Sequence, residues 1–475
     1  MVWDERNGDQ WGGDKSEQGP MLPNRMQIIG RAAFRQARQP GPFNFAPEPP
    51  SIPRGGGILS EEYGTAEPTQ ALTRAMERQI RRHVTGPEQR FLAVAPPELA
   101  PLCFDELLAL GFSSAERTPA GVEFTGKLRM GYAANLWLRT ASRILCRIAR
   151  FRAGAVEELF KHCVALRWEL WLPPGVPPSV ESHVARSRIE HEGAVVRTVY
   201  RAIERRFDSL GMPSPSRSKS GESEPSGEGA SDPLKRQRVL VHIEDNSCEI
   251  SLDMTGGHLH QRGYRLEHAG APLRETLAAA ILMRSGWVGH TPLVDGMCGS
   301  GTFAIEACLL ARRIPPAAGR SFLFEKWPSF EDRTWEYLKR KAREQAASRI
   351  TAPVLGVDRD PRSLEISLAN AARAGVERDI QWVLEDFFGW DPGRLGLKGG
   401  TVLLNPPYGK RLREEAPHKT YEKVGAHLRK AFRGWRAVVL APDRESAARL
   451  RLPAARYWKV THGGSPVTVV IGDVH

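Results

Sequence analysis

The stretch LVDGMCGSGT, residues 293–302, decides the fold. Its first residues fit the end of a buried strand, and the glycines after them fit a tight turn into a helix that begins near Thr302. Open α/β sheets bind ligands at the carboxyl ends of their strands, where such a turn lies. The spacing is neither G-x-G-x-x-G nor a phosphate loop, so a standard dinucleotide or nucleotide site is not predicted. Taken alone, the turn also fits a purely structural strand-to-helix connection.

Strands and helices alternate outward from this turn. Strand-like runs lie at residues 292–295, 354–358, 382–384, 401–404 and 437–440. An apolar helix over 273–283, stopped by Gly286, precedes them, and helical patterns lie between them. This alternation predicts a doubly wound parallel sheet. Two further strands, 457–460 and 467–471, predict a β-hairpin at the sheet edge. Residues 313–350 exceed an ordinary connection and predict an insertion, helical around 332–347.

Two acidic positions follow the second and third of these strands. Asp358 ends the run VLGVD and could accept hydrogen bonds from ribose hydroxyls. Asp360 is expected instead to cap the helix that begins at Pro361. After the third strand lies Glu385-Asp386-Phe387, where a carboxylate could accept from an adenine amino group and the aromatic residue could flank the ring. Acidic loop residues are also common as plain solvated side chains.

The most specific motif is LNPPYG, residues 404–409, after the fourth strand. An exocyclic base amine is a poor nucleophile because its lone pair is delocalised into the ring. Asn405 offers a side-chain carbonyl and Pro406 a backbone carbonyl, which together can accept both N–H bonds and orient the lone pair. Pro407 fixes the direction of the chain, and Tyr408 offers a face for an extruded base. The alternative is a Pro-rich turn with a buried tyrosine.

Other polar residues point less clearly to a function. Lys410, Arg411 and Arg413 could meet phosphates or the target base, or form a solvated basic face. His258 and His260 lack further ligands, so no metal site is expected. The stretch Arg262-Gly263-Tyr264-Arg265 either binds RNA or joins two domains.

The N-terminal half is less regular. Residues 1–86, rich in Gly, Pro, Arg and Gln, predict a mostly disordered basic tail. Later patterns predict strands at 91–94, 122–124, 168–172, 239–243 and 248–252, and helices at 99–110, 131–145, 155–165 and 195–210. Residues 213–234, dominated by Ser, Gly, Pro and Glu, predict a flexible insertion inside a domain. The mixture indicates small α/β domains.

Composition narrows the partners. The 475 residues carry a formal net charge of +12, which favours a polyanion such as RNA or DNA. Six scattered cysteines form no C-x-x-C pair, which fits a reducing compartment. No signal peptide and no apolar run of about 20 residues is present, so a cytoplasmic protein without a membrane contact is expected. The sequence does not reveal an oligomeric state.

These motifs resemble the THUMP-containing class I RNA methyltransferases, and most closely the bacterial large-subunit (23S) ribosomal RNA guanine-N2 methyltransferases. The resemblance covers about residues 91–475. Beyond the two motifs above, it rests on RGYR (262–265), APLRETLA (271–278) and RSFLFEKWP (320–328).

The resemblance implies S-adenosyl-L-methionine as cofactor and RNA as substrate. It implies a ferredoxin-like segment over 87–155, a THUMP domain over 156–265 and a class I methyltransferase domain over 266–475. The expected cofactor-binding residues are Asp295, Gly296, Cys298, Gly299, Gly301, Thr302, Asp358, Asp386, Phe387, Pro272 and Leu273. Asn405, Pro406, Pro407 and Tyr408 would form the catalytic site.

Three alternatives remain open at this point. The substrate could be transfer RNA rather than ribosomal RNA. Because the Asn-Pro-Pro-Tyr motif suits any planar base amine, the enzyme could methylate adenine N6 or cytosine N4 in DNA. A non-catalytic RNA-binding assembly protein is the third alternative, against which the intact motifs speak.

Overall fold

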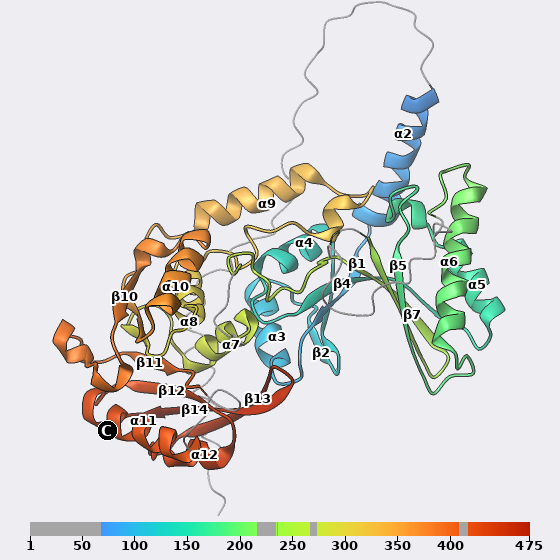
Figure 1. Ribbon diagram of the computed structural model, residues 1–475. Coiled ribbons are helices and arrows are strands. Elements are labelled where there is room, and N and C mark those ends of the chain that lie inside the picture. Colours follow the sequence, from blue (N-terminus) through green and yellow to red (C-terminus); the bar gives the residue numbers. More distant parts are fainter. Residues whose placement is uncertain (1–67, 216–233, 235, 267–272, 408–416) are drawn as a thin grey trace, which may run out of the picture. The chain divides into compact units, whose positions relative to one another are not determined.

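The computed structural model describes residues 68–215, 234, 236–266, 273–407 and 417–475. Within these residues the chain forms two seven-stranded sheets, each combined with helices (Figure 1). We call them the N-terminal sheet (β1 to β7) and the C-terminal sheet (β8 to β14).

The C-terminal sheet has the strand order β10-β9-β8-β11-β12-β14-β13. Its strands are β8 (Leu293–Asp295), β9 (Val354–Asp358), β10 (Ile380–Leu384), β11 (Thr401–Leu404), β12 (Arg436–Ala441), β13 (Arg456–His462) and β14 (Ser465–Asp473). The first five run parallel, and β14 is antiparallel to both β12 and β13. The predicted doubly wound sheet with its terminal hairpin is confirmed.

Both faces of this sheet are covered by helices. The helices are α7 (Glu275–Ser285), α8 (Thr302–Ala311), α10 (Pro361–Arg373), α11 (Pro417–Ala431) and α12 (Arg444–Arg449), with short 3-10 turns η4 (Glu377–Asp379), η5 (Phe387–Gly389) and η6 (Pro392–Leu395). The turn η3 (Leu323–Lys326) and helix α9 (Asp332–Gln345) lie in the insertion and pack elsewhere. Neighbouring strand residues alternate between two apolar clusters: Leu403 packs with α7, α8 and α10, whereas Leu404 packs with α11 and α12. Burial on both faces explains why the strands are continuous apolar runs.

The strand order reverses between β8 and β11. From β8 the chain proceeds outward to β9 and β10, then returns to place β11 on the other side of β8. Leu403 lies opposite Asp295 in the parallel pair, so the chain segments after these two strands emerge side by side. Such a switch point is where open α/β sheets bind ligands.

The N-terminal sheet has the order β2-β3-β1-β4-β7-β6-β5. Its strands are β1 (Gln89–Val94), β2 (Glu116–Thr118), β3 (Gly121–Gly126), β4 (Arg143–Arg152), β5 (Ser179–Ala185), β6 (Arg238–Glu244) and β7 (Ser247–Asp253). The helices are α2 (Pro68–Ile80), η1 (Arg81–Thr85), α3 (Ala100–Ala109), α4 (Leu128–Trp137), α5 (Val156–Ala165), η2 (Trp168–Leu170) and α6 (Glu192–Ser209). The border expected at residue 155 follows β4, and β7 pairs directly with β4, so one sheet continues across that border.

Three local predictions in this half are wrong. The helix expected over 131–145 ends at Trp137, because residues 143–152 pair with β1 and β7 as the central strand β4. The strand expected at 168–172 is a 3-10 turn, closed by bonds from the nitrogens of Trp171 and Leu172 to the carbonyl of Trp168. The tail expected to reach residue 86 is helical from Pro68, and Val84 is fully buried.

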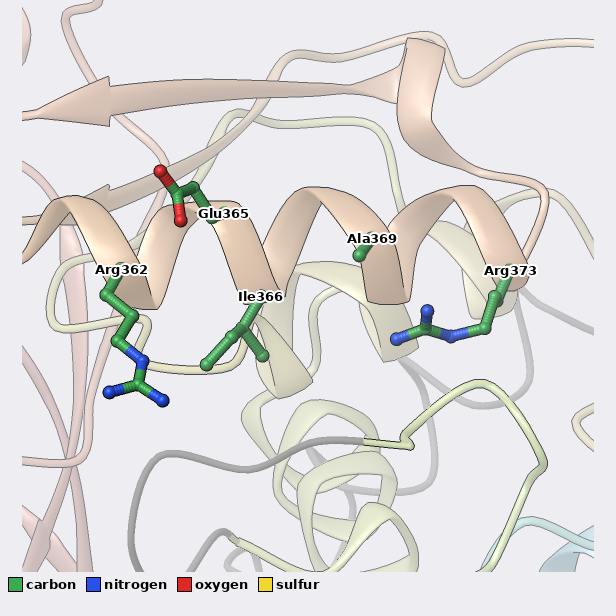
Figure 2. A pocket seen from close by; sticks show the side chains of 5 residues that line it. All are labelled: Arg362, Glu365, Ile366, Ala369 and Arg373. Carbon is green, nitrogen blue, oxygen red and sulfur yellow. The ribbon is translucent and has the colours of Figure 1, made fainter.

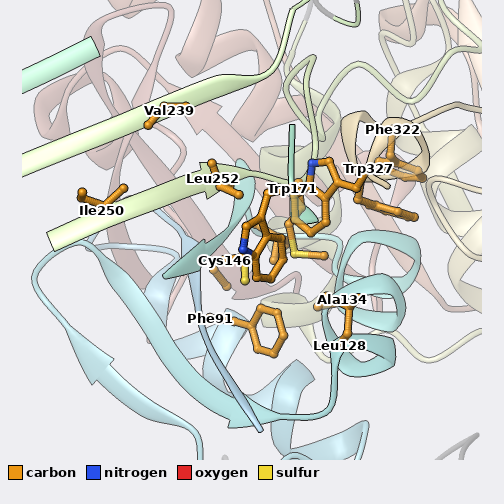
Figure 3. Packing of buried hydrophobic residues seen from close by; sticks show 14 of the residues in the cluster. Phe91, Leu128, Ala134, Cys146, Trp171, Val239, Ile250, Leu252, Phe322 and Trp327 are labelled. Atoms are coloured by element: carbon orange, nitrogen blue, oxygen red, sulfur yellow. The ribbon is translucent and has the colours of Figure 1, made fainter. Parts of the chain in front are cut away.

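The insertion between α8 and β9 packs against the N-terminal sheet. Its residues Phe322, Phe324, Trp327 and Trp335 belong to the same apolar cluster as Phe91 and Leu252 (Figure 3). Phe324 stacks on Tyr132 at 4.4 Å between ring centroids, and the Trp327 indole donates to Gln237 at 2.7 Å. The predicted insertion is confirmed, and its side chains complete the core of the N-terminal sheet. The low-complexity stretch 213–234 lies largely outside the described residues.

Two absences concern only the described part of the chain. No helix there is long and apolar enough to cross a bilayer. No group of three or more His, Cys, Asp or Glu side chains there could hold a metal ion.

Candidate cofactor and active site

Four predicted motifs meet at one edge of the C-terminal sheet. Asp295 ends β8, Asp358 ends β9, Asp386 lies two residues beyond β10, and Asn405 follows β11. Hydrogen bonds tie the neighbours together: Gly299 N donates to Asp358 Oδ2 at 2.8 Å, and Gly296 N to the carbonyl of Leu403 at 3.0 Å. The sequence-based expectation that these motifs lie side by side is therefore met by the backbone.

The glycine turn, residues 296–301, has two different requirements for glycine. Gly301 has a φ of 77°, and a Cβ there would lie 2.8 Å from Trp382 Cη2. A Cβ on Gly296 would lie 2.6 Å from Leu404 Cδ2. Gly299 also has a left-handed φ of 54°, but no atom lies within 4 Å of its Cβ position. Packing thus requires Gly296 and Gly301, whereas Gly299 faces open space that a ligand can approach closely.

The carboxylate of Asp358 is held against this turn. Its Oδ2 accepts from Gly299 N, and its Oδ1 accepts from Asp360 N at 3.0 Å. Asp360 caps α10 as predicted, since its side chain accepts from Arg362 N at 3.2 Å and from the Ser363 hydroxyl at 2.8 Å. The Ser363 hydrogen bond lowers the pKa of Asp360. Because Asp360 caps the helix, Asp358 is the carboxylate beside the glycine turn that could bind ribose hydroxyls.

In the third motif, Asp386 lies at the surface and Phe387 lies in the core. Asp386 is half exposed, and its Oδ1 accepts from Phe388 N at 2.9 Å. Phe387 is only 3% exposed, and its ring packs on Phe432 and His427 with centroids 5.6 and 4.8 Å away. The aromatic that reaches the surface is Phe388, 39% exposed, which sequence reasoning missed. Two consecutive phenylalanines in a 3-10 turn point to different faces. The pair Phe387-Phe388 in the sequence was therefore the signal that one ring could be buried and the other exposed.

Asn405 carries an unsatisfied acceptor. Its Oδ1 is buried and has no hydrogen-bond partner among the described residues. Pro406 is buried and Pro407 exposed. A buried polar atom without a partner is costly, so its retention at a strand end indicates a ligand donor that completes it. Tyr408, Lys410, Arg411 and Arg413 lie outside the described residues.

The remaining predicted cofactor residues that the structure describes are buried. Leu273 and Thr302 are 4% and 5% exposed. Cys298 N donates to the carbonyl of Val357 at 3.1 Å, and burial raises the pKa of its thiol well above the ordinary value. Cys298 thus holds the turn against β9 and is not a reactive thiolate. Pro272 lies outside the described residues.

Taken together, these residues fit S-adenosyl-L-methionine. The open face at Gly299 admits close contact with the backbone, and the Asp358 carboxylate beside it suits a ribose. Asn405 Oδ1 supplies the free acceptor next to that cradle.

Asp295 provides a prediction about pH. It is 1% exposed, and burial raises the pKa of its carboxyl to about 8, although the nitrogen of Ala304 lies 3.4 Å from Oδ2. A folded-state pKa above the unfolded one stabilises the fold at low pH, and this contribution is lost as pH rises towards 8. Asp295→Asn, which resembles the protonated acid, should therefore gain stability relative to wild type between pH 5 and pH 8.5. Urea unfolding at both pH values measures this, and a difference that does not grow with pH would contradict it.

A cavity of about 160 Å³ lies along α10 (Figure 2). It is lined by Arg362, Glu365, Ile366, Ala369 and Arg373. It contains none of the predicted cofactor residues. Arg373 also holds the neighbouring linker, because its Nε donates to the carbonyl of Tyr264 at 2.7 Å.

The stretch 262–265 joins the two halves of the chain. Arg262, 3% exposed, donates through Nη2 to the carbonyl of Arg139 at 2.6 Å, and its Nε lies 3.5 Å from Glu306 in α8. The Tyr264 hydroxyl donates to Glu306 at 3.2 Å. Arg139 Nη2 donates to the carbonyl of Leu309 in the last turn of α8 at 3.1 Å, and to the carbonyl of Ile314, three residues beyond that helix, at 2.7 Å. Of the two readings of this stretch, the joining role is confirmed for Arg262 and Tyr264.

His258 and His260 stack on each other beside this junction, with ring centroids 5.3 Å apart. Burial, and then the charge of Arg143, lowers the pKa of His258 to about 4. Burial likewise lowers the pKa of His260 to about 3. Both rings are therefore neutral at physiological pH.

Comparison with known proteins identifies the family. A model of the RMKL-like methyltransferase domain matches residues 262–471, and one of the RlmL ferredoxin-like domain matches residues 90–145. A protein of Synechocystis sp. named as a candidate RNA methyltransferase is 30% identical over 385 residues, which cover 80% of this chain and 95% of that protein. The chain belongs to the RMKL-like methyltransferase family. The class I methyltransferase fold and the family resemblance seen in the motifs are thereby confirmed.

Other relatives of this RMKL-like methyltransferase are larger. The "Ribosomal RNA large subunit methyltransferase K/L" of Methylococcus capsulatus is 36% identical over 394 residues, which cover 81% of this chain and 51% of that protein. The chain thus spans about half the length of the K/L relatives it matches. Among solved structures, the candidate methyltransferase SMU.472 complexed with SAH has a TM-score of 0.71 and 27% identity, over 82% of this chain and 98% of that one. A predicted N6-adenine-specific DNA methylase from Listeria monocytogenes has a TM-score of 0.69 and 26% identity, over 82% and 97%.

Proposed function

We propose that this protein transfers a methyl group from S-adenosyl-L-methionine to the exocyclic N2 of a guanine in 23S ribosomal RNA. The observation that carries the proposal is the buried, unpartnered Oδ1 of Asn405, next to a glycine turn with an open face at Gly299. The oxygen of Asn405 can accept a hydrogen bond from a base amine, and the glycine turn beside it can bind the cofactor. This combination suits the methylation of an amine.

The chain's own residues would mainly bind and orient. Asn405 Oδ1 accepts one N–H of the guanine amine and the Pro406 carbonyl accepts the other, which turns the lone pair towards the methyl donor. Tyr408 stacks on the extruded base. When bound, the cofactor supplies an electrophilic methyl on its sulfonium. The glycine turn, with Cys298 and Thr302, would hold the methionine end, Asp358 the ribose and Asp386 the adenine, covered by Pro272 and Leu273.

The choice of ribosomal RNA rests on charge and on relatives. The formal net charge of +12 suits a polyanion, and relatives of about 35% identity are named as large-subunit ribosomal RNA methyltransferases. We assign RNA docking to a ferredoxin-like segment, residues 87–155, and a THUMP region, residues 156–265. Contacts to phosphates make this docking salt-dependent, and the reaction takes place in the cytoplasm.

Nucleoside mass spectrometry tests the proposal. N2-methylguanosine is quantified in large-subunit ribosomal RNA and in transfer RNA from a strain that lacks the gene and from its parent. Loss from large-subunit RNA, restored by the wild-type gene but not by Asn405→Ala, supports the proposal. Loss from transfer RNA alone overturns the choice of substrate. Unchanged RNA overturns the proposed reaction, and N6-methyladenine in DNA is then measured, as the Listeria structure's name suggests.

A further inference from the structure

Arg265 binds two segments that flank the glycine turn. Its Nη2 donates to the Thr302 hydroxyl at 2.6 Å and to the carbonyl of Leu273 at 3.0 Å. The carboxylate of Glu275 lies 3.6 Å from the same nitrogen. The side chain of Arg265 is only 9% exposed, so these contacts are shielded from solvent.

The two acceptors belong to two different segments of the candidate site, which we call its two walls. Thr302 is the first residue of α8, directly after Gly301. Leu273 lies just before α7, in the segment expected to cover the cofactor. A single guanidinium nitrogen therefore joins the first residue of α8 to the segment just before α7.

We propose that Arg265 is a positioning residue that fixes these two walls at the spacing that S-adenosyl-L-methionine requires. The inference rests on the proposed function. Hydrogen bonds from a charged donor in a buried setting are stronger than neutral ones, so they can define this spacing. Glu275 stabilises the buried cation and keeps the guanidinium from turning outward.

The neighbours of Arg265 make the clamp rigid. The hydroxyl of Tyr264 is bonded to Glu306 in α8, and its carbonyl accepts from Arg373 in α10. The backbone that leads to Arg265 is thus anchored to two helices of the C-terminal sheet. Arg262 is a natural control, because it is also an arginine that donates two hydrogen bonds to backbone carbonyls, but these are the carbonyls of Leu259 and Arg139.

Calorimetric titration of the full chain with SAH, used as a stable probe, tests the proposal. Arg265→Gln should raise the Kd about tenfold or more, and Arg265→Lys, which keeps a charged donor, should fall between it and wild type. Arg262→Gln should lower the melting temperature while leaving the Kd within about twofold of wild type, because the hydrogen bonds of Arg262 go to the carbonyls of Leu259 and Arg139 and to neither wall of the site.

Each other outcome has a definite meaning. An unchanged Kd for Arg265→Gln, or an equal loss of affinity in Arg262→Gln, overturns the positioning role. If wild type itself fails to bind SAH, the proposed function is wrong, and the inference falls with it. If Arg265→Gln does not fold because Glu275 has lost its cation, Arg265→Gln combined with Glu275→Gln removes both charges. Wild-type affinity in that double variant overturns the proposal.

Discussion

Replacement of Asn405 by alanine should lower the single-turnover rate of methyl transfer by about 10²–10³-fold, the usual effect of deleting one orienting acceptor or donor at a reacting centre. The fold should not suffer. Asn405 Oδ1 has no partner among the described residues, so its removal takes away an unsatisfied buried atom and leaves the free energy of unfolding unchanged or higher by up to about 1 kcal/mol. Loss of activity without loss of stability is the signature of an acceptor kept for the substrate.

Rapid-quench assays with purified ribosomal RNA and urea unfolding measure the two effects. Asn370→Ala is the matched control for stability, because its amide donates to the carbonyl of Ser300 at 3.1 Å and its oxygen accepts from Arg373 at 2.6 Å. It should lose about 1–2 kcal/mol of stability, since both bonds disappear. A near-normal methylation rate in Asn405→Ala would show that the base amine is oriented by other groups.

Alanine at Gly301 should be the most destabilising single change in the glycine turn. A residue with a side chain at φ 77° is strained by about 1–2 kcal/mol, and a Cβ 2.8 Å from Trp382 and 3.1 Å from Ser367 adds about 1–3 kcal/mol of overpacking. The sum is a large share of the stability of a typical domain. Urea unfolding of Gly301→Ala measures the loss directly.

Gly299→Ala should affect the affinity for SAH more than the stability of the fold. Its φ of 54° carries similar strain, but no atom lies within 4 Å of the new methyl group, which enters the open face of the turn. We expect a stability loss of about 1 kcal/mol and a rise of about tenfold or more in the Kd for SAH. Gly463→Ala is its control: φ is 58°, nothing lies within 4 Å, and the residue sits in the β13–β14 hairpin. Equal loss of SAH affinity in Gly463→Ala would exclude a local effect at Gly299.

Much of the C-terminal half could be predicted because local signals and topology agree. The buried strands are apolar runs, Gly286 and Asp360 mark helix ends as expected, and parallel strands bring Asp358 and Asn405 to the same edge. The central strand β4 was missed, because its arginine-rich sequence follows a helix directly and its pairing with β1 and β7 depends on distant segments.

The finer details of the site depend on contacts between segments far apart in the chain. Burial of Phe387 follows from its packing on Phe432, and Asn405 Oδ1 finds no hydrogen-bond donor among the residues that the structure describes. The contact of Arg265 with Thr302 spans 37 positions. No period or motif in the sequence encodes such pairings, so residue types could be proposed from the sequence while their partners could not.

The contacts of Arg139 and Arg262 with α8 also limit which parts of the chain can be exchanged between related proteins. Arg139 donates to the carbonyl of Leu309 in the last turn of that helix and to that of Ile314 beyond it, and Glu306 in the middle of the helix is fully buried beside Arg262. A catalytic fragment cut at residue 266 would retain Glu306 but lose both arginines, which strands a carboxylate in the interior. A chimera of two relatives should therefore fold only when Arg139, Arg262 and Glu306 all come from the same parent. The three buried charged side chains come from both halves of the chain, so neither half can be exchanged without the other.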